Sequence, residues 1–347
     1  MRKVLVILLA VAFLSFGLVA WMKAALNEKV AQSHSDAFIQ IAPGLAPGDA
    51  IAELGQAGVL KYPQVLYAYV KWRHQGRLIK AGDYKFASPI SALAVLEQLK
   101  QGGTSANKLT VVEGWNRFDI SRAMAGIASL NLHRDREALG YLSNLALIKD
   151  FDPQAKNLEG YLYPETYLVY LNTKPIELVQ QMVGQFRQVW KNKLASKASK
   201  AGLSVHDAVT MASIIETEAK LKEERKLIAS VLYNRLKKKM ALGMDSTVVY
   251  ASQIAGQWRH DGRVYQSDLN IDSPYNTRMY KGLPPGPVSS PGLPSLEAAI
   301  SPAKTEYLYY VRDPARNDGA HHFYTNESGF AKGVEALRAW EKQHGRR

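Results

Sequence analysis

The chain has 347 residues, of which 47% are hydrophobic and 22% are charged, so it can form two or more folded domains and is not intrinsically disordered. Its formal net charge of +13 favours an anionic surrounding, such as nucleic acid, anionic lipid or an acidic polymer. The lack of cysteine excludes disulfides and thiolate zinc sites.

The N-terminus carries an uncharged run, VLVILLAVAFLSFGLVAWM, over residues 4–22. At about 1.5 Å per residue, this run would span roughly 28 Å as a helix, close to the hydrocarbon core of a bilayer. It ends in bulky Trp21 and Met22, whereas a signal-peptide cleavage site has small residues. We therefore expect residues 1–23 to form an uncleaved anchor and the rest of the chain to lie outside the cytoplasm. Nucleic acid is then not an expected partner.

Two folded regions are predicted after the anchor. Residues 24–37 are mostly polar and predict a stalk. Over residues 38–103, strand-like stretches alternate with helix-like ones, and the last helix ends at Gly102 and Gly103. This pattern predicts a small α+β module. The remaining chain, 104–347, opens with the strand-like KLTVVEGW and is mostly helical, so the fold class is α+β.

Three features of the second region bear on function. The segment NLEGYLYPETYLV, residues 157–169, is rich in aromatic and turn residues and is not typical of a regular core. Between Tyr275 and Pro294 the chain has eight prolines and glycines, which predict a long irregular loop. Such a loop either builds a site or serves as a rigid connection. The stretches YLYYVRD and HHFYTN predict two strands before a closing helix.

The stretch MASIIETEAK carries two glutamates on one predicted helix, residues 205–220. At about 100° per residue, Glu216 lies about 60° from the centre of the apolar stripe and Glu218 about 100° from it on the other side. Glu216 is thus nearer the buried edge, where desolvation favours the protonated carboxyl that a general acid needs. Glu218 is better placed for water or a supporting contact. Periodicity alone favours a plainer interpretation, in which Glu216 is a snorkelling or salt-bridged surface residue.

Seven stretches, taken together and in order, resemble the membrane-bound endolytic murein transglycosylases, a family of cell-wall enzymes. They are LEGYLYPETY, MASIIETEA, VLYNRL, MDSTVVY, SPYNTRMYKGLPPGPVSSPG, SPAKTEYLYYV and HHFYTN. The family carries a LysM-like module before its catalytic domain, which would correspond to residues 38–103. The departures are Ser246, where a proline is common, and Tyr324, where smaller residues occur.

The resemblance implies roles for individual residues. Glu216 is the catalytic glutamate, and Glu218 has a supporting role. The implied substrate-binding residues are Tyr161, Asp245, Tyr275, Asn276, Gly282, Leu283, Pro284, Pro285, Gly286 and Tyr307. Tyr161, Tyr275 and Tyr307 are candidates for stacking on sugars, while Asn276 and the backbone of the GLPPG loop are candidates for stabilising an oxocarbenium-like intermediate. No cofactor or metal is expected.

The implied reaction needs one carboxyl group. Glu216 would protonate the departing oxygen of the β-1,4 bond after N-acetylmuramic acid, and would then accept the proton of the muramoyl C6 hydroxyl as it closes onto C1. The resulting 1,6-anhydro ends would limit or terminate the elongation of nascent strands. Two alternatives remain open. If Asp245, Glu159 or Glu165 faces Glu216, a muramidase-type hydrolase becomes possible; otherwise the chain could be a non-catalytic peptidoglycan-binding anchor.

The resemblance also implies partners and a location. Glycan strands and the cytoplasmic (inner) membrane, crossed once, are the expected partners. Peptidoglycan synthesis proteins are a further candidate, and the catalytic domain is expected in the periplasm or extracytoplasmic space.

Overall fold

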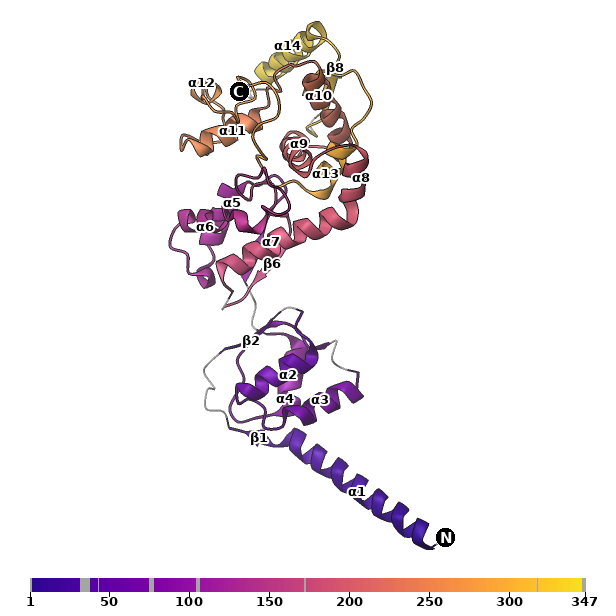
Figure 1. The fold of residues 1–347 in the computed structure, drawn as a ribbon. Coiled ribbons are helices and arrows are strands. Elements are labelled where there is room, and N and C mark those ends of the chain that lie inside the picture. The colour runs from indigo at the N-terminus through magenta and orange to yellow at the C-terminus, as the bar shows by residue number, and fades with distance from the viewer. Residues whose placement is uncertain are drawn as a thin grey trace. The chain divides into compact units, whose positions relative to one another are not determined.

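The computed structural model describes residues 2–31, 38–42, 44–74, 78–103, 107–171, 173–316 and 318–344. The chain forms two compact units (Figure 1). The first comprises Met1–Lys108 with Leu168–Thr173, and the second comprises Leu109–Tyr167 with Lys174–Arg347. Both contain helices and short strands, so the mixed α+β class predicted from the sequence is confirmed.

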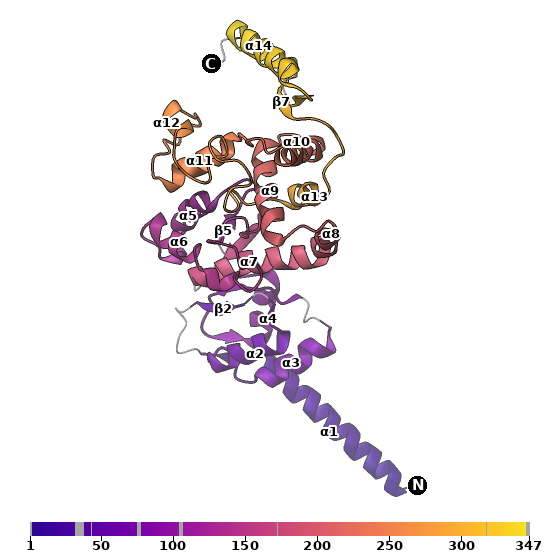
Figure 2. The ribbon, with the colours of Figure 1, turned by 45° about the horizontal axis from the view of Figure 1, so that its top comes forward.

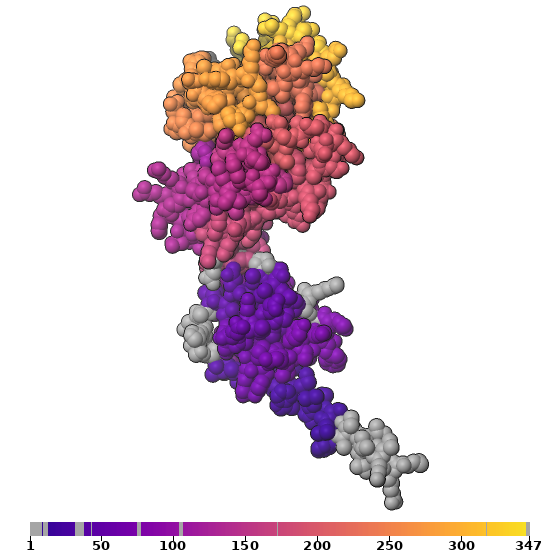
Figure 3. All heavy atoms as spheres, viewed as in Figure 1, coloured from indigo at the N-terminus to yellow at the C-terminus, as the bar shows by residue number. Residues whose placement is uncertain are grey.

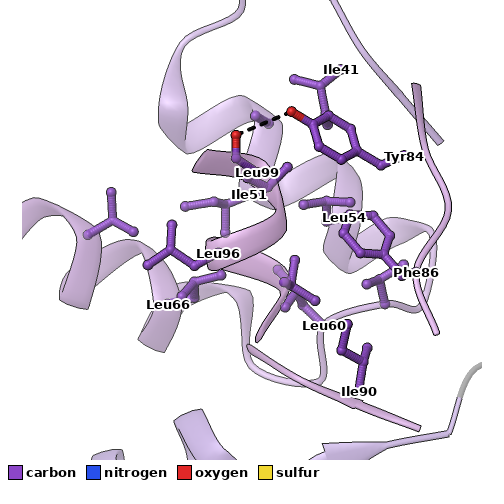
Figure 4. Close-up of a cluster of buried hydrophobic side chains, with 14 of the residues drawn as sticks. Ile41, Ile51, Leu54, Leu60, Leu66, Tyr84, Phe86, Ile90, Leu96 and Leu99 are labelled. Atoms are coloured by element: carbon purple, nitrogen blue, oxygen red, sulfur yellow. Dashed lines mark hydrogen bonds between the residues drawn. The ribbon is translucent and has the colours of Figure 1, made fainter. Parts of the chain in front are cut away.

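The first unit packs three short helices over two small strand pairs. Its elements are α1 (Arg2–Asn27), β1 (Lys29–Val30), β2 (Ile39–Ile41), α2 (Pro47–Gln56), α3 (Pro63–Trp72), β3 (Gly82–Tyr84), β4 (Ile90–Ser91) and α4 (Ala92–Gln101). Strand β1 pairs with β4 and β2 with β3, both antiparallel. Aliphatic side chains of α2, α3 and α4 meet Tyr84 and Phe86 in one core, where the Tyr84 hydroxyl also donates to the Leu99 carbonyl (Figure 4).

The N-terminal helix continues further than the predicted anchor. Helix α1 extends to Asn27, and Leu26 is buried in the core of the first unit although the sequence places it in the polar stalk. Residues 32–37 of that stalk lie outside the described residues. Across the helices that the structure describes, none combines the length and the apolarity needed to cross a bilayer. The anchor over residues 1–23 therefore stays a prediction.

The second unit is mostly helical. Strands β5 (Asn107–Thr110) and β6 (Thr166–Val169) each have two residues in either unit. The other elements of the second unit are α5 (Arg117–Ala125), α6 (Asp135–Tyr141), α7 (Pro175–Val189), α8 (Ala195–Lys200), α9 (Val205–Glu218), α10 (Arg225–Lys237), α11 (Asp245–Ile254), α12 (Gln266–Leu269), α13 (Leu293–Ile300), β7 (Tyr309–Arg312), β8 (His321–Tyr324) and α14 (Glu327–Gln343). Strand β5 pairs with β6, and β7 with β8. The two predicted C-terminal strands and the closing helix are thus confirmed.

Helix α9 is the central element of this unit. It contacts α10, α11 and α13, which lie around it in both views (Figures 1 and 2). The helix begins after Ser204, whose hydroxyl accepts the Asp207 N–H at 3.0 Å, and ends where Ala219 adopts an extended conformation. Every residue from Ala208 to Glu216 is buried, so α9 has no solvent-facing side over this length.

Two segments with no regular structure close around α9. The predicted proline- and glycine-rich loop is confirmed as irregular chain up to Gly292, but Pro294 belongs to the first turn of α13, a position where proline is well tolerated. Residues 158–162 are also irregular, yet Leu158, Tyr161 and Leu162 are fully buried. The segment is thus irregular, as predicted, but it contributes to the core, because the Tyr161 ring packs edge-on against Phe186 of α7.

Segments distant in the sequence share one face of the second unit. The space-filling view shows the magenta region that contains α5 next to the orange region that contains α11 (Figure 3). The Asn116 amide before α5 donates to Gln253 of α11 at 2.7 Å, and Phe118 packs on Tyr250. The start of the second unit is thereby fixed against its later helices.

Candidate functional site

The carboxyl group of Glu216 lies in the last turn of α9 and is held from two directions. Its Oε1 accepts a hydrogen bond from Arg225 Nη2 at 3.0 Å, and its Oε2 accepts one from the Gly292 N–H at 2.8 Å. Glu216 is 8% exposed, so the helix-face prediction that it points towards the interior is confirmed. Both partners donate, however, and therefore favour the ionised carboxylate.

Arg225 is itself fixed by the fold. It is the first residue of α10, and its Nε donates to Ser295 Oγ of α13 at 3.0 Å. Its guanidinium and the Glu216 carboxylate form a buried ion pair. The apolar setting expected for a protonated Glu216 is therefore not what the structure contains: a charged partner from α10, not visible in the periodicity of α9, stands beside the carboxyl.

A second carboxyl group, that of Glu113, lies beside the same glycine. A Cβ atom at Gly292 would fall 1.9 Å from Glu113 Oε1, so the Glu113 carboxyl rests directly on the Gly292 backbone. The next residue, Gly114, lies close to Glu216: a Cβ atom there would be 4.0 Å from Glu216 Cγ. Gly292 is thus in contact with the carboxyl groups of both Glu113 and Glu216.

Backbone hydrogen bonds hold the two segments together. The Gly114 N–H donates to the Ser290 carbonyl at 2.9 Å, and the Ser290 N–H donates back to the Trp115 carbonyl at 2.6 Å. This short pairing joins the end of the KLTVVEGW stretch to the end of the long loop. Glu113, which belongs to neither a helix nor a strand, is thereby held near Glu216 of α9.

The electrostatic surroundings raise the pKa of Glu113. Partial burial is the largest cause, and the negative charge of Glu216 adds to it, while Arg225 and Lys222 act in the opposite direction. Glu113 is nevertheless exposed on the surface, whereas Glu216 is not. The accessible carboxyl of this pair is thus one whose pKa its surroundings raise.

The long loop is anchored on α9 at several points. Ser213 Oγ accepts the Val288 N–H at 3.0 Å, and the Ser213 carbonyl accepts the Ser289 hydroxyl at 2.9 Å. Both ring nitrogens of His206 face acceptor oxygens, the Pro285 carbonyl at 3.1 Å and Asp152 Oδ2 at 2.8 Å. The bond with Asp152 raises the pKa of His206, which favours the imidazolium that can donate to both. The loop is therefore tied to the helix that carries Glu216.

Two of the predicted substrate-binding residues lie in the interior. Tyr161 is fully buried and its hydroxyl donates to Asp152, so its ring offers no face to a sugar. Asn276 is also fully buried, and its Nδ2 donates to the Leu269 and Ile271 carbonyls at 2.9 and 3.0 Å. Because these bonds use both amide hydrogens, Asn276 shapes the loop and has no donor left for an intermediate.

The other predicted residues are spread over the loop and its surroundings. The hydroxyl of Tyr275 lies 3.3 Å from the Cβ position of Gly286, and burial raises the pKa of Tyr275 to about 12. Within the loop, Gly282, Leu283 and Pro285 are partly exposed, and Pro284 and Gly286 are buried.

Asp245 and Tyr307 contact neighbours other than Glu216. The Asp245 side chain is 58% exposed and pairs with Arg278, while the partly exposed ring of Tyr307 lies 5.5 Å from that of Phe323. Neither has a hydrogen bond or ion pair with Glu216.

Two further carboxyls named as possible partners of Glu216 bind elsewhere. Glu159 accepts the Arg117 N–H at 3.0 Å, and Glu165 accepts from Gln185 at 3.0 Å. In the part of the chain that the structure describes, the carboxyl that lies beside Glu216 is Glu113, which the sequence reasoning missed together with Arg225 and Gly292.

Glu218 lies in a different environment from Glu216. Its carboxyl accepts from Ser246 at 3.0 Å and from Tyr310 at 2.9 Å. Burial raises the pKa of Glu218, and these two hydrogen bonds partly offset the effect. The side chain borders a cavity of about 410 Å³ that is also lined by Lys220, Arg312 and Arg316. These contacts link α9 to α11 and β7, consistent with a supporting position.

Comparison with known proteins places the chain among close relatives. A model of the YceG-like family matches residues 39–336. An endolytic murein transglycosylase of Bacillus subtilis (strain 168) is 35% identical over 305 residues, 83% of this chain and 82% of the relative. One from Streptococcus pneumoniae (strain D39) is 31% identical over 323 residues, 84% of this chain but 57% of the relative. The crystal structure of a YceG-like protein from Listeria monocytogenes matches with a TM-score of 0.58 and 30% identity, covering 85% of this chain and 98% of that one.

Proposed function

The chain belongs to the YceG-like family, and on that premise we propose that it is an endolytic murein transglycosylase. It cuts peptidoglycan strands internally, at the β-1,4 bond that follows N-acetylmuramic acid. The observation that carries the proposal is the buried Glu216 carboxyl, fixed by Arg225 and by the N–H of Gly292 at the end of a loop that is anchored on the same helix.

The proposed reaction breaks one bond and forms another. The bond between C1 of the muramoyl residue and O4 of the next sugar breaks, and O4 receives a proton. The muramoyl C6 hydroxyl then closes onto C1 and loses its own proton, which leaves a 1,6-anhydro end and consumes no water. Glu216, ionised beside Arg225, is suited to stabilising the positive charge that develops at C1 and to accepting the C6 proton.

The other parts of the chain would place the catalytic region close to its substrate. We propose that residues 4–22 anchor the protein in the cytoplasmic membrane, that residues 38–103 are a LysM-like module, and that residues 104–347 act outside the cytoplasm on strands near the membrane. The uncharged N-terminal run and the family resemblance support this arrangement. Protease added to spheroplasts should degrade the body of the protein; protection of the body would refute the proposed orientation.

The Glu113 carboxyl gives one alternative a specific basis. Most glycoside hydrolases use two carboxyl groups beside the bond that they cleave, and Glu113 and Glu216 both contact Gly292. In a hydrolase, water attacks C1 in place of the C6 hydroxyl. The two reactions leave different ends on the same fragment. A hydrolase leaves a reducing muramic acid, whereas a transglycosylase leaves the anhydro form.

The test uses the full chain in detergent with uncrosslinked glycan strands. Unaltered protein, Glu216→Gln and Glu218→Gln are incubated separately, and the new ends are identified by mass spectrometry. We expect anhydro ends from the unaltered protein, a loss of about 100-fold or more in Glu216→Gln, and a smaller loss in Glu218→Gln. Reducing ends would replace the proposal with hydrolysis. Strands that are bound but uncut would favour a non-catalytic peptidoglycan-binding anchor.

A further inference from the structure

The proposed reaction begins with a proton that Glu216 is poorly placed to hold. Both of its carboxyl oxygens accept hydrogen bonds, one from a guanidinium and one from a backbone N–H. Protonating either oxygen would weaken a buried ion pair or lose a hydrogen bond. The first proton transfer therefore calls for a second group.

Glu113 meets the three requirements for such a group. Its carboxyl is adjacent to Glu216 across Gly292, its side chain is exposed to solvent and hence to substrate, and its surroundings favour the protonated form. The charged and titratable groups that face it are Glu216 from α9, Arg225 from α10, Lys222 from the turn before α10, and Tyr163. Of these, Arg225 and Lys222 lower the pKa of Glu113, but the net shift of this pKa is still upward.

Arg225 has a further buried donor at this centre. Its Nη2 binds Glu216 and its Nε binds Ser295, but the buried Nη1 has no hydrogen-bond partner among the described residues. A buried donor without an acceptor is costly, and in native structures such a group accompanies strain, a catalytic role, or a bound water or ion. A carboxylate formed at Glu113 during the reaction would be stabilised by this positive charge.

We propose that Glu113 is a second catalytic carboxyl, which donates the first proton to the departing O4 oxygen while Glu216 stays ionised and accepts the proton of the C6 hydroxyl. After one turnover Glu113 is ionised and Glu216 is protonated, and transfer of this proton back to Glu113 restores the starting state. One proton circulates, the bond from C1 to O4 is replaced by one from C1 to O6, and no water is needed. This inference rests on the proposed function. It assigns proton donation to Glu113 and proton acceptance to Glu216, where the family resemblance implies both roles for Glu216.

The test depends on how strongly the leaving group needs an acid. Glycan strands leave a sugar hydroxyl, which must be protonated, whereas a dinitrophenyl glycoside of the GlcNAc–MurNAc disaccharide leaves a stable phenolate that needs no proton. The full chain is compared with Glu113→Gln, Glu216→Gln and Glu223→Gln on both substrates. Glu223 is exposed on the turn before α10 and serves as the matched control for loss of one carboxylate.

We expect Glu113→Gln to cut strands about 100-fold more slowly or worse, and to act on the dinitrophenyl glycoside within about 10-fold of the unaltered protein. Glu216→Gln should lose both activities, and Glu223→Gln neither. The fall in strand cleavage as pH rises through the raised pKa of Glu113 should also disappear in Glu113→Gln.

Two results would overturn the inference. One is strand cleavage by Glu113→Gln within threefold of the unaltered protein. The other is an equal loss on both substrates at an unchanged melting temperature, which would make Glu113 a positioning residue. If Glu113→Gln does not fold, Glu113→Asp, which retains an acid on a shorter side chain, should favour the dinitrophenyl glycoside over strands relative to the unaltered protein; equal loss on both substrates would again refute the proposal. Lack of strand cleavage by the unaltered protein would instead refute the proposed function.

Discussion

Replacing Gly292 by alanine should move Glu113 while leaving the contacts of Glu216 in place. The new Cβ would lie 1.9 Å from Glu113 Oε1, and ordinary contact begins at 3.4 Å, so the carboxyl must retreat by about 1.5 Å. The backbone tolerates the change, because Gly292 has φ −76° and ψ 170°, an extended conformation that alanine adopts without strain. The N–H that binds Glu216 is kept.

The expected loss of activity follows from that displacement. A misplacement of about 1 Å in a reacting group can cost roughly 100-fold in rate, so Gly292→Ala should cut strands about 100-fold more slowly. The helix-capping position should cost only about 1 kcal/mol in unfolding free energy, since alanine is a poorer N-cap than glycine. Strand cleavage followed by mass spectrometry, and urea denaturation, measure the two effects separately.

Two comparisons make this prediction specific. Gly184→Ala, on an exposed position of α7 with open space around it, should retain full activity and gain about 1 kcal/mol of stability. The double variant Gly292→Ala with Glu113→Gln should be no slower than Glu113→Gln alone, because both changes remove the same group. Full activity of Gly292→Ala, or losses that multiply in the double variant, would refute the reasoning.

Three further predictions concern buried groups. Arg225→Gln leaves Glu216 charged and buried without its ion-pair partner, so the unfolding free energy at pH 7 should fall by about 3–5 kcal/mol in urea denaturation; a change below 1 kcal/mol would contradict the pairing. Burial raises the pKa of Glu159 to about 7 from 4.5, so the folded protein binds this proton more tightly than the unfolded chain does, and stability should fall by about 3 kcal/mol as pH rises from 4.5 to 7. Glu159→Gln should remove this share of the pH dependence, and an unchanged slope would show that Glu159 does not titrate there. Tyr161→Phe should lower the unfolding free energy by about 1–3 kcal/mol, because Asp152 loses a hydrogen-bond donor. Strand cleavage per folded molecule should stay within threefold of the unaltered protein. A large rise in KM without loss of stability would instead show that Tyr161 binds the sugar.

The helix that carries Glu216 could be predicted closely from the sequence, but not its surroundings. The predicted helix, 205–220, differs from α9 only at its last turn. Periodicity predicts one buried stripe, whereas α9 is enclosed on all sides from Ala208 to Glu216. Ser213 shows why. Its hydroxyl donates to the Thr210 carbonyl at 2.8 Å and accepts the Val288 N–H. A polar residue that predicts a solvent-exposed face thus has its hydrogen-bond partners inside the protein.

The groups around Glu216 could not be predicted from the sequence pattern, because each comes from another segment and is brought near Glu216 by tertiary contacts. Glu113 follows a strand and Gly292 ends a loop, and the backbone pairing of Gly114 and Trp115 with Ser290 joins these segments. A sequence pattern of period 2 or 3.6 describes neighbours within one element and contains no information on such a pairing. Tyr161 illustrates the reverse case, since an aromatic in a turn-rich motif resembled a surface platform but fills the core.

The charges of the proposed centre change in step with those of the substrate. Before reaction, ionised Glu216 and Arg225 cancel and Glu113 is neutral, which suits an uncharged glycosidic bond. Donation of the proton leaves Glu113 negative at the moment when C1 becomes positive, so a net charge of −1 faces the oxocarbenium-like state. Electrostatic stabilisation that appears only in the transition state raises the rate without tightening substrate binding. A single carboxyl beside Arg225 would also end negative after donating its proton, but it would first have to hold that proton against the guanidinium.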